Sequence, residues 1–257
     1  MASATPSLLT PDDPPPVTVL NPDGASPFLF IGDHAGNVIP SRLGSLGLPD
    51  HELRRHIGWD IGVGGLGAML AEAMKAPFIR QTYSRLVIDC NRREGAPDSI
   101  AAVSDGTVVP GNAHLSADDR AARLAELHDP YHWAIETELQ RRAAAGVPTV
   151  LIALHSFTPR LASGAPRPWH VGVLHDGGDP SFATALLVEL ARDAALVVGD
   201  NEPYRMDLID YTIPRHAYSA MLPYAELEIR QDLIADEAGQ RRWAAILADA
   251  LTAALKV

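Results

Sequence analysis

The 257-residue chain has almost no cysteine and comparatively little basic charge. Cys90 is its single cysteine, which excludes a disulfide framework and any Cys-rich metal cluster. A metal ion would therefore need His, Asp, Glu or Asn ligands. Lys and Arg number 21 against 32 Asp and Glu, a formal net charge of −11. Because an acidic surface repels phosphate backbones and anionic lipids, we expect neither nucleic acid nor a membrane surface as a partner.

The chain also lacks a long hydrophobic run and a recognisable targeting segment. No segment approaches the roughly 20 apolar residues of a membrane span. Residues 1–26 contain neither a basic stretch nor a continuous apolar segment, and their prolines and aspartates indicate an extended arm. We expect a cytoplasmic protein in which this arm (1–26) precedes one domain (27–257).

Beyond the arm, short apolar runs alternate with longer amphipathic segments. This rhythm predicts an α/β sheet covered by helices on both faces, and 47% hydrophobic residues suffice for one substantial core. The predicted strands are Pro27–Ile31, Phe78–Gln81, Leu86–Cys90, Thr149–Leu154, Trp169–Leu174, Leu196–Gly199 and Tyr224–Ile229. The predicted helices are Pro49–Met74, a long helix from a Ser116 capping box toward Ala145, Pro180–Arg192 and Asp236–Leu255.

Polar side chains gather where several predicted strands end. In open α/β sheets, ligands bind just beyond the carboxyl ends of the strands. A single histidine there is more often a hydrogen-bonded structural residue, but polar groups at the ends of separate strands favour one shared pocket. These groups are Asp33, His34, Asp89, Asn91, Arg92, His155, Ser156, Glu226 and Glu228.

These residue types suit metal-assisted hydrolysis. The imidazoles of His34 and His155, with one oxygen ligand, would leave a position for water on a zinc ion. Zinc lowers the pKa of that water toward about 7, and a nearby carboxylate can take its proton. Glu228 is the candidate base, and neighbouring arginines would bind a substrate carboxylate or the oxyanion that forms on the attacked carbonyl.

Six segments in this order resemble the N-formylglutamate amidohydrolase family, over roughly residues 27–255. They read FLFIGDHAGNVIP, HIGWDIG, YSRLVIDCNR, LHSFTP, NEPY and LEIRQDLI. The family is related in fold to zinc carboxypeptidases and aspartoacylases. The resemblance therefore implies a single-domain, three-layer α/β/α sandwich with a mixed, mostly parallel sheet. It also implies one catalytic zinc or another divalent metal.

The resemblance also implies roles for individual residues. His34 and His155 match the histidine ligands, and Glu228 matches the general base, with Glu226 as its rival on the same strand face. The residues that match the groups holding the substrate carboxylate and carbonyl oxygen are Arg85, Asn91 and Arg92.

The chain departs from the relatives at one metal ligand. Where the carboxypeptidases have a ligating Glu three residues after the first His, this chain has Asn37, whose amide oxygen is a poor zinc ligand. Asp60, in the GWDIG segment, is the preferred third ligand, with Asn37 as the alternative.

The expected reaction is hydrolysis of N-formyl-L-glutamate, a small anionic substrate, to formate and glutamate. The loops leave open another N-acyl amino acid or a peptide-like amide. Asn37 leaves open a non-catalytic binding protein on a degenerate hydrolase scaffold. A homo-oligomer is possible, because nothing in the sequence sets the number of subunits.

Three other motifs are given structural interpretations. Residues 62–67 spell G-x-G-x-x-G, but no hydrophobic strand precedes them, so close helix packing explains these glycines better than a nucleotide site. His128 and His132 have the spacing of a zincin helix, but Pro130 is expected to break that helix. Cys90 is expected to be a small buried residue.

Overall fold

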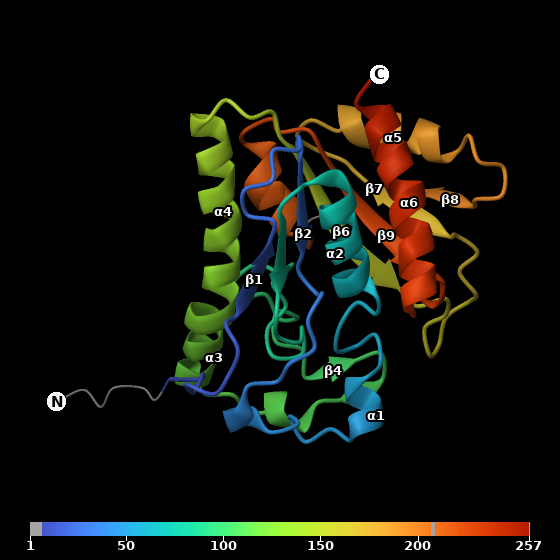
Figure 1. Cartoon of the computed structure of the whole chain (residues 1–257). Helices are drawn as coiled ribbons and strands as arrows, with labels where there is room; N and C mark the ends of the chain where they lie inside the picture. The colour runs from blue at the N-terminus through green and yellow to red at the C-terminus, as the bar shows by residue number, and fades with distance from the viewer. Residues whose placement is uncertain (1–6, 207–208, 257) are drawn as a thin grey trace.

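The structure, a computed structural model, describes residues 7–206 and 209–256, and a seven-stranded sheet forms its centre (Figure 1). The strand order is β1-β3-β2-β6-β9-β7-β8. β1 pairs antiparallel with β3 and β7 antiparallel with β9, whereas the other neighbours are parallel. The strands are β1 (Val17–Leu20), β2 (Phe28–Gly32), β3 (Phe78–Gln81), β6 (Val150–Phe157), β7 (Val171–Leu174), β8 (Val198–Asp200) and β9 (Tyr224–Arg230).

Helices cover both faces of this sheet, which confirms the three-layer α/β/α sandwich. On one face, α2 (Val63–Met74), α5 (Ser181–Leu190) and α6 (Glu237–Ala254) pack over a large apolar cluster. On the other face, α4 (Asp129–Ala144) packs over a second cluster (Figure 1). The short elements are α1 (Asp50–Leu53), α3 (Ala117–Arg123) and the hairpin β4 (Val103–Ser104) and β5 (Thr107–Val108). No helix of residues 7–206 and 209–256 has the length and apolarity needed to cross a bilayer.

The central strands are buried on both sides, as expected of inner parallel strands. Every residue of β2 and β6 is buried. Because successive side chains of a strand point to opposite faces, alternate residues of β6 enter the two apolar clusters: Ile152 and Leu154 face α2 and α6, whereas Leu151 and Ala153 face α4. The polar residues at the carboxyl end of β6 follow the same alternation.

The predicted helix from Ser116 is confirmed, with one departure. Ser116 forms the capping box with Asp119, and α3 continues into α4 through a π-helical turn, Leu124–His128. Pro130 does not end the helix as predicted. It lies in the first turn of α4, directly after the π-helical turn, where the irregular hydrogen-bond pattern accommodates a residue without an N–H.

The predicted strand Leu86–Cys90 is wrong. These residues form a buried turn outside the sheet, and two of its backbone carbonyls accept hydrogen bonds from side chains of distant segments. The Asn112 amide donates to Leu86 O at 2.8 Å and the Arg123 guanidinium to Val87 O at 2.9 Å. The apolar run is buried, as predicted, but its hydrogen bonds are satisfied without a sheet.

Two further segments differ from expectation. The predicted helix Pro49–Met74 is divided into α1 and α2, and residues 54–62 between them form turns that carry Asp60. Within the predicted arm, Val17–Leu20 form the edge strand β1. The boundary at residue 27 between an arm and the domain stays a prediction.

Candidate metal centre and active site

A cavity of about 450 Å³ lies at the carboxyl ends of β2, β6 and β9. β2 ends at Gly32 and delivers Asp33 and His34 to this edge of the sheet. β6 and β9 pair so that His155 lies opposite Glu228 and Ala153 opposite Glu226. Both glutamates therefore lie on the same face as His155 and line the cavity with it.

His34, Asp60 and His155 converge at the floor of this cavity. Asp60 Oδ2 lies 3.4 Å from His34 Nδ1 and 2.9 Å from His155 Nδ1. All three side chains are buried, and one donor atom from each lies within 4.8 Å of the others. Asp60 lies in the turn before α2, and its position is fixed by its own backbone N–H, which donates to His34 O at 2.9 Å.

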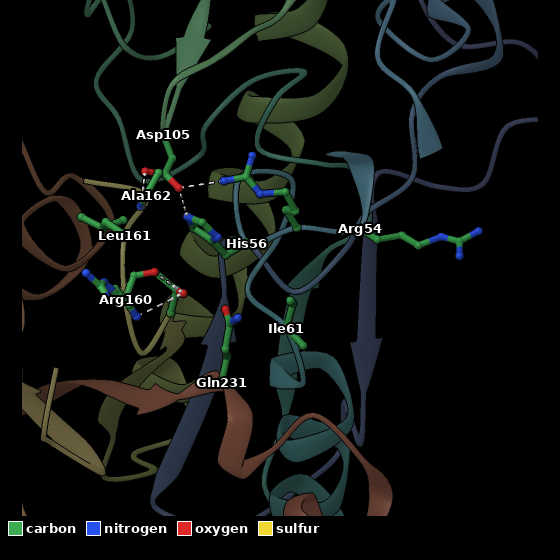
Figure 2. A pocket seen from close by; sticks show the side chains of 10 residues that line it. Arg54, His56, Ile61, Asp105, Arg160, Leu161, Ala162 and Gln231 are labelled. Carbon is green, nitrogen blue, oxygen red and sulfur yellow. Dashed lines mark hydrogen bonds and ion pairs between the residues drawn. The ribbon is translucent and has the colours of Figure 1, made fainter. Parts of the chain in front are cut away.

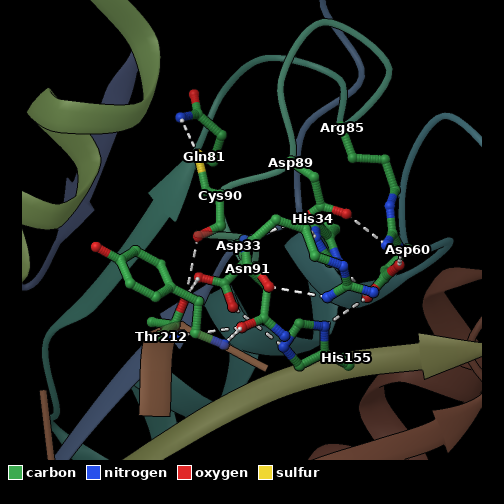
Figure 3. A network of polar contacts seen from close by, with 12 residues as sticks. Asp33, His34, Asp60, Gln81, Arg85, Asp89, Cys90, Asn91, His155 and Thr212 are labelled. Atoms are coloured by element: carbon green, nitrogen blue, oxygen red, sulfur yellow. Dashed lines mark hydrogen bonds and ion pairs between the residues drawn. The ribbon is translucent and has the colours of Figure 1, made fainter. Parts of the chain in front are cut away.

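A second carboxylate lies behind each histidine (Figure 3). His34 Nε2 lies 2.7 Å from Asp89 Oδ1, and His155 Nε2 lies 3.2 Å from Asp33 Oδ2. Each imidazole thus presents Nδ1 to Asp60 and Nε2 to a carboxylate. Histidines that bind metals in proteins are oriented in this way by their second ring nitrogen.

The three side chains fit a divalent cation. Two ligands at about 2.0 to 2.1 Å from a tetrahedral zinc lie about 3.3 Å apart, close to the 2.9 and 3.4 Å separations around Asp60 Oδ2. His34 Nδ1 is buried without a hydrogen-bond partner. Burial favours protonation of Asp60, but the charges of His34 and His155 and their hydrogen bonds outweigh it and hold its pKa well below the usual range. An ionised oxygen and two imidazole nitrogens form a zinc donor set.

Asn37, the alternative third ligand, has a different environment. Its amide Nδ2 donates to Leu53 O at 2.8 Å, at the end of α1. The group of possible metal ligands found in the described part of the chain contains Asp60 with the two histidines. The geometry therefore favours Asp60 over Asn37.

The predicted arginines border the cavity, each held by an acid. Arg85 donates to Asp89 Oδ2 at 2.6 Å, and its other terminal nitrogen lies 3.5 Å from Asp60 Oδ1. Arg92 donates to Asp98 at 2.7 Å and to Asn91 O at 2.8 Å. A guanidinium has five N–H donors, so both side chains retain donors beyond these contacts.

Asn91 anchors a loop at the wall of the cavity. Its Oδ1 accepts the backbone N–H groups of Tyr211 and Thr212, each at 2.9 Å. Thr212 in turn donates its hydroxyl to Asp33 Oδ1 at 3.0 Å. The amide oxygen is thus occupied by this loop, and Asn91 also lines the cavity.

Glu226 and Glu228 bring two buried carboxyls to one wall. Each has one oxygen, Oε2, that is buried without a hydrogen-bond partner. Burial raises the pKa of Glu228 to about 8, with partial compensation from the His155 charge. Burial, with the negative charges of Asp210 and Glu228, also raises the pKa of Glu226 well above its usual range. Such groups are typical of active sites, where a carboxyl gains or loses a proton near neutral pH.

Sequence reasoning missed several groups at or near the cavity. The sequence identifies Asp33 only as a strand-end residue, yet its Oδ2 lies 3.2 Å from His155 Nε2. Tyr204 belongs to the NEPY segment, for which the sequence predicts no role, yet it lines the cavity. The Tyr204 hydroxyl accepts a hydrogen bond from Arg167 at 2.9 Å, and the Arg167 guanidinium also lies over the Tyr204 ring. His56 and Arg205 also line the cavity. No spacing in the sequence links these residues.

The motifs interpreted as structural lie outside the cluster of His34, Asp60 and His155. His132 and His216 form a buried stacked pair, and His132 also contacts the ring of His128. Cys90 is buried, as expected. A Cβ at Gly62 would lie 2.1 Å from Ile234 O, and one at Gly67 2.3 Å from the Phe78 ring, which confirms that close packing explains the glycines.

Comparison with known proteins agrees with this architecture. The sequence profile of the family described as N-formylglutamate amidohydrolase matches residues 26–235. The crystal structure of a gene product from Agrobacterium tumefaciens is 35% identical, with a TM-score of 0.93 over 97% of this chain and 98% of that one. The crystal structure of an N-formylglutamate amidohydrolase from Ralstonia eutropha is 21% identical, with a TM-score of 0.66 over 94% of this chain and 96% of that one. None of the curated proteins matches the chain.

Proposed function

Because the chain belongs to the N-formylglutamate amidohydrolase family, we propose that it is a metal-dependent enzyme that hydrolyses N-formyl-L-glutamate to formate and glutamate. The observation that carries this proposal is the convergence of His34, Asp60 and His155 beside Glu228. Family membership supports hydrolysis of a linear amide. The donor set and the adjacent carboxyl support metal dependence and the identity of the base.

His34, Asp60 and His155 would hold the metal, with zinc the ion that their donors suit best. When bound, such an ion lowers the pKa of a water molecule and polarises a carbonyl oxygen. Asp89 and Asp33 orient the two imidazoles from behind. This support keeps both Nδ1 atoms directed at one point, which a productive site requires.

Glu228 would act as general base and then as general acid. It takes a proton from the attacking water and delivers it to the nitrogen of the departing amine. Its position opposite His155 on the adjoining strand holds the carboxyl at the edge of the donor set. A pKa raised to about 8 suits a group that must both accept and release a proton.

The arginines and Asn91 would bind the substrate. Arg85 is held by ion pairs with Asp60 and Asp89, and its remaining donors would stabilise the negative charge that forms on the attacked carbonyl oxygen. Arg92 would bind the α-carboxylate, and Asn91 would hold the loop that closes this wall.

The test is formate release from N-formyl-L-glutamate by protein as purified, stripped by a chelator and reloaded with zinc, with metal quantified in each sample. We expect activity to disappear on stripping and to return with zinc. The Glu228→Gln variant should lose at least about a hundredfold in kcat, the usual range for a general base, and retain its metal. Glu226→Gln is the matched control on the same strand.

Other outcomes would contradict parts of the proposal. Full activity of Glu228→Gln would reject that residue as the base and, if Glu226→Gln is inactive, transfer the role to Glu226. Bound zinc without formate release would favour another N-acyl amino acid, tested with an acyl amino acid panel, or a binding protein if no member of the panel reacts. Absence of both metal and activity would reject the mechanism.

A further inference from the structure

The cavity contains one cation that the proposed mechanism does not use. Arg205 lines the cavity, and within residues 7–206 and 209–256 its guanidinium makes no hydrogen bond or ion pair. The other arginines of the cavity differ in this respect, because Arg85 is paired with Asp89 and Arg92 with Asp98. Arg205 is exposed at the cavity wall, and in a chain of net charge −11 an arginine that pairs with no acid of the described residues is available to a ligand anion.

The residues before and after Arg205, Tyr204 and Met206, are held by contacts with other parts of the chain. On one side, Tyr204 accepts a hydrogen bond from Arg167 at 2.9 Å, and the Arg167 guanidinium lies 4.8 Å from the centroid of the Tyr204 ring. On the other side, Met206 is 3% exposed, and its N–H donates to Asn201 at 3.4 Å. Arg205 therefore extends from a segment whose two neighbouring residues are held by contacts with the rest of the fold.

The same segment is fitted against the sheet at two glycines. A Cβ at Gly172 would lie 1.8 Å from Glu202 O, and one at Gly199 would lie 2.8 Å from the Glu202 Cβ. Only residues without a side chain allow the segment to approach β7 and β8 this closely. The segment that carries Arg205 is therefore packed closely against the sheet at Glu202.

The neighbouring basic groups do not replace Arg205. A second hollow adjoins the cavity at His56, Asp105, Thr158 and Leu161. In this hollow Asp105 binds Arg55 at 2.8 Å and contacts His56 at 3.3 Å (Figure 2). The Arg54 side chain points away from the other lining residues (Figure 2), and Arg160 does not line the catalytic cavity.

We propose that Arg205 binds the side-chain carboxylate of the substrate and selects acidic N-formyl amino acids over neutral ones. This inference rests on the proposed function, under which the acyl group is a formyl group and the amino acid carries two carboxylates. The α-carboxylate lies next to the scissile amide, so we assign it to Arg92, whose backbone N–H donates to Asp89 O at 3.2 Å beside the candidate metal ligand His34. The side-chain carboxylate lies farther from the amide and needs a second cation, which Arg205 supplies.

The test compares N-formyl-L-glutamate with N-formyl-L-glutamine, which has nearly the same shape but no side-chain charge. The wild-type enzyme should prefer the glutamate compound by at least about tenfold in kcat/KM, mainly through KM, because a charge-assisted bond is lost with the amide. In Arg205→Gln this preference should fall to about threefold or less, with the glutamine compound unaffected. Arg205→Lys should be intermediate, because lysine keeps the charge but not the bidentate geometry.

The control is Arg241→Gln, which removes an arginine that is 70% exposed on α6 and should not change the preference. Equal kcat/KM for the two compounds in the wild-type enzyme would overturn the role of Arg205 while leaving the proposed deformylation intact. An unchanged preference in Arg205→Gln would do the same. Failure of every preparation to release formate from either compound would instead refute the proposed function, and the inference with it.

Discussion

Acidification should destabilise the protein through the buried histidine pair formed by His132 and His216. His132 Nδ1 lies 2.9 Å from His216 Nε2, and His132 Nε2 lies 2.9 Å from Cys90 O. Burial lowers the pKa of both histidines, and the charge of Arg215 lowers that of His216 further. Both rings are therefore neutral in the folded protein at pH 7.

The size of the effect follows from the pKa of His216, which is lowered to about 4 in the folded state. A histidine in the unfolded chain has a pKa of about 6.5. Because the unfolded state binds the proton first, stability is highest above pH 6.5 and is lost as the pH falls from there toward 4. At pH 5 linkage gives a loss of about 2 kcal/mol from His216, and His132 contributes in the same direction.

The assay is urea unfolding at pH 7.5 and pH 5 at constant ionic strength. The His216→Gln variant keeps an amide that can hydrogen-bond with His132 but cannot titrate in this range. It should lose about 2 kcal/mol less than the wild type between the two pH values. His51→Gln, at a side chain that is 76% exposed, controls for removal of a histidine. A loss in His216→Gln equal to that of the wild type would refute this reasoning.

Three further predictions concern the site and its support. Asp33→Asn and Asp89→Asn should each weaken metal binding by about 10- to 100-fold in competition with a chelator, and an unchanged affinity would show that the carboxylate does not orient its histidine. Gly172→Ala should lower the midpoint of thermal unfolding, because its Cβ would lie 1.8 Å from Glu202 O; a destabilisation of about 1–3 kcal/mol is expected, and an unchanged midpoint would contradict the close packing. Cys90 should resist thiol reagents in the native protein and react after denaturation, since it is fully buried and burial raises its pKa well above the usual value; rapid native labelling would show that the turn opens.

The sequence predicted the sheet class and both histidines of the candidate metal centre because these depend on local patterns. A continuous apolar run identifies an inner strand, and the residues near its carboxyl end reach the edge where ligands bind. His34 and His155 were found in this way, although β6 extends to Phe157, so that His155 lies within the strand and not after it.

The remaining groups depend on contacts between distant segments. Asp60 lies in a turn between two helices, and its place beside His155 depends on a separation of 95 residues. The buried run Leu86–Cys90 has the composition of a strand, yet side chains from residues 112 and 123 satisfy its backbone. No sequence pattern marks Arg205, because only the fold shows that it pairs with no acid of residues 7–206 and 209–256.

The pairing of β6 with β9 also affects how the chain folds. Leu227 and Ile229 enter the apolar cluster under α2, α5 and α6, whereas Glu226 and Glu228 alternate with them on the opposite face. A one-residue slip between the strands would exchange these sets. Two carboxyls would then enter a hydrocarbon core, at a cost of several kcal/mol. The acidic residues of the candidate active site thus make misaligned versions of the sheet unstable, so the same two side chains would serve both the proposed chemistry and the strand alignment.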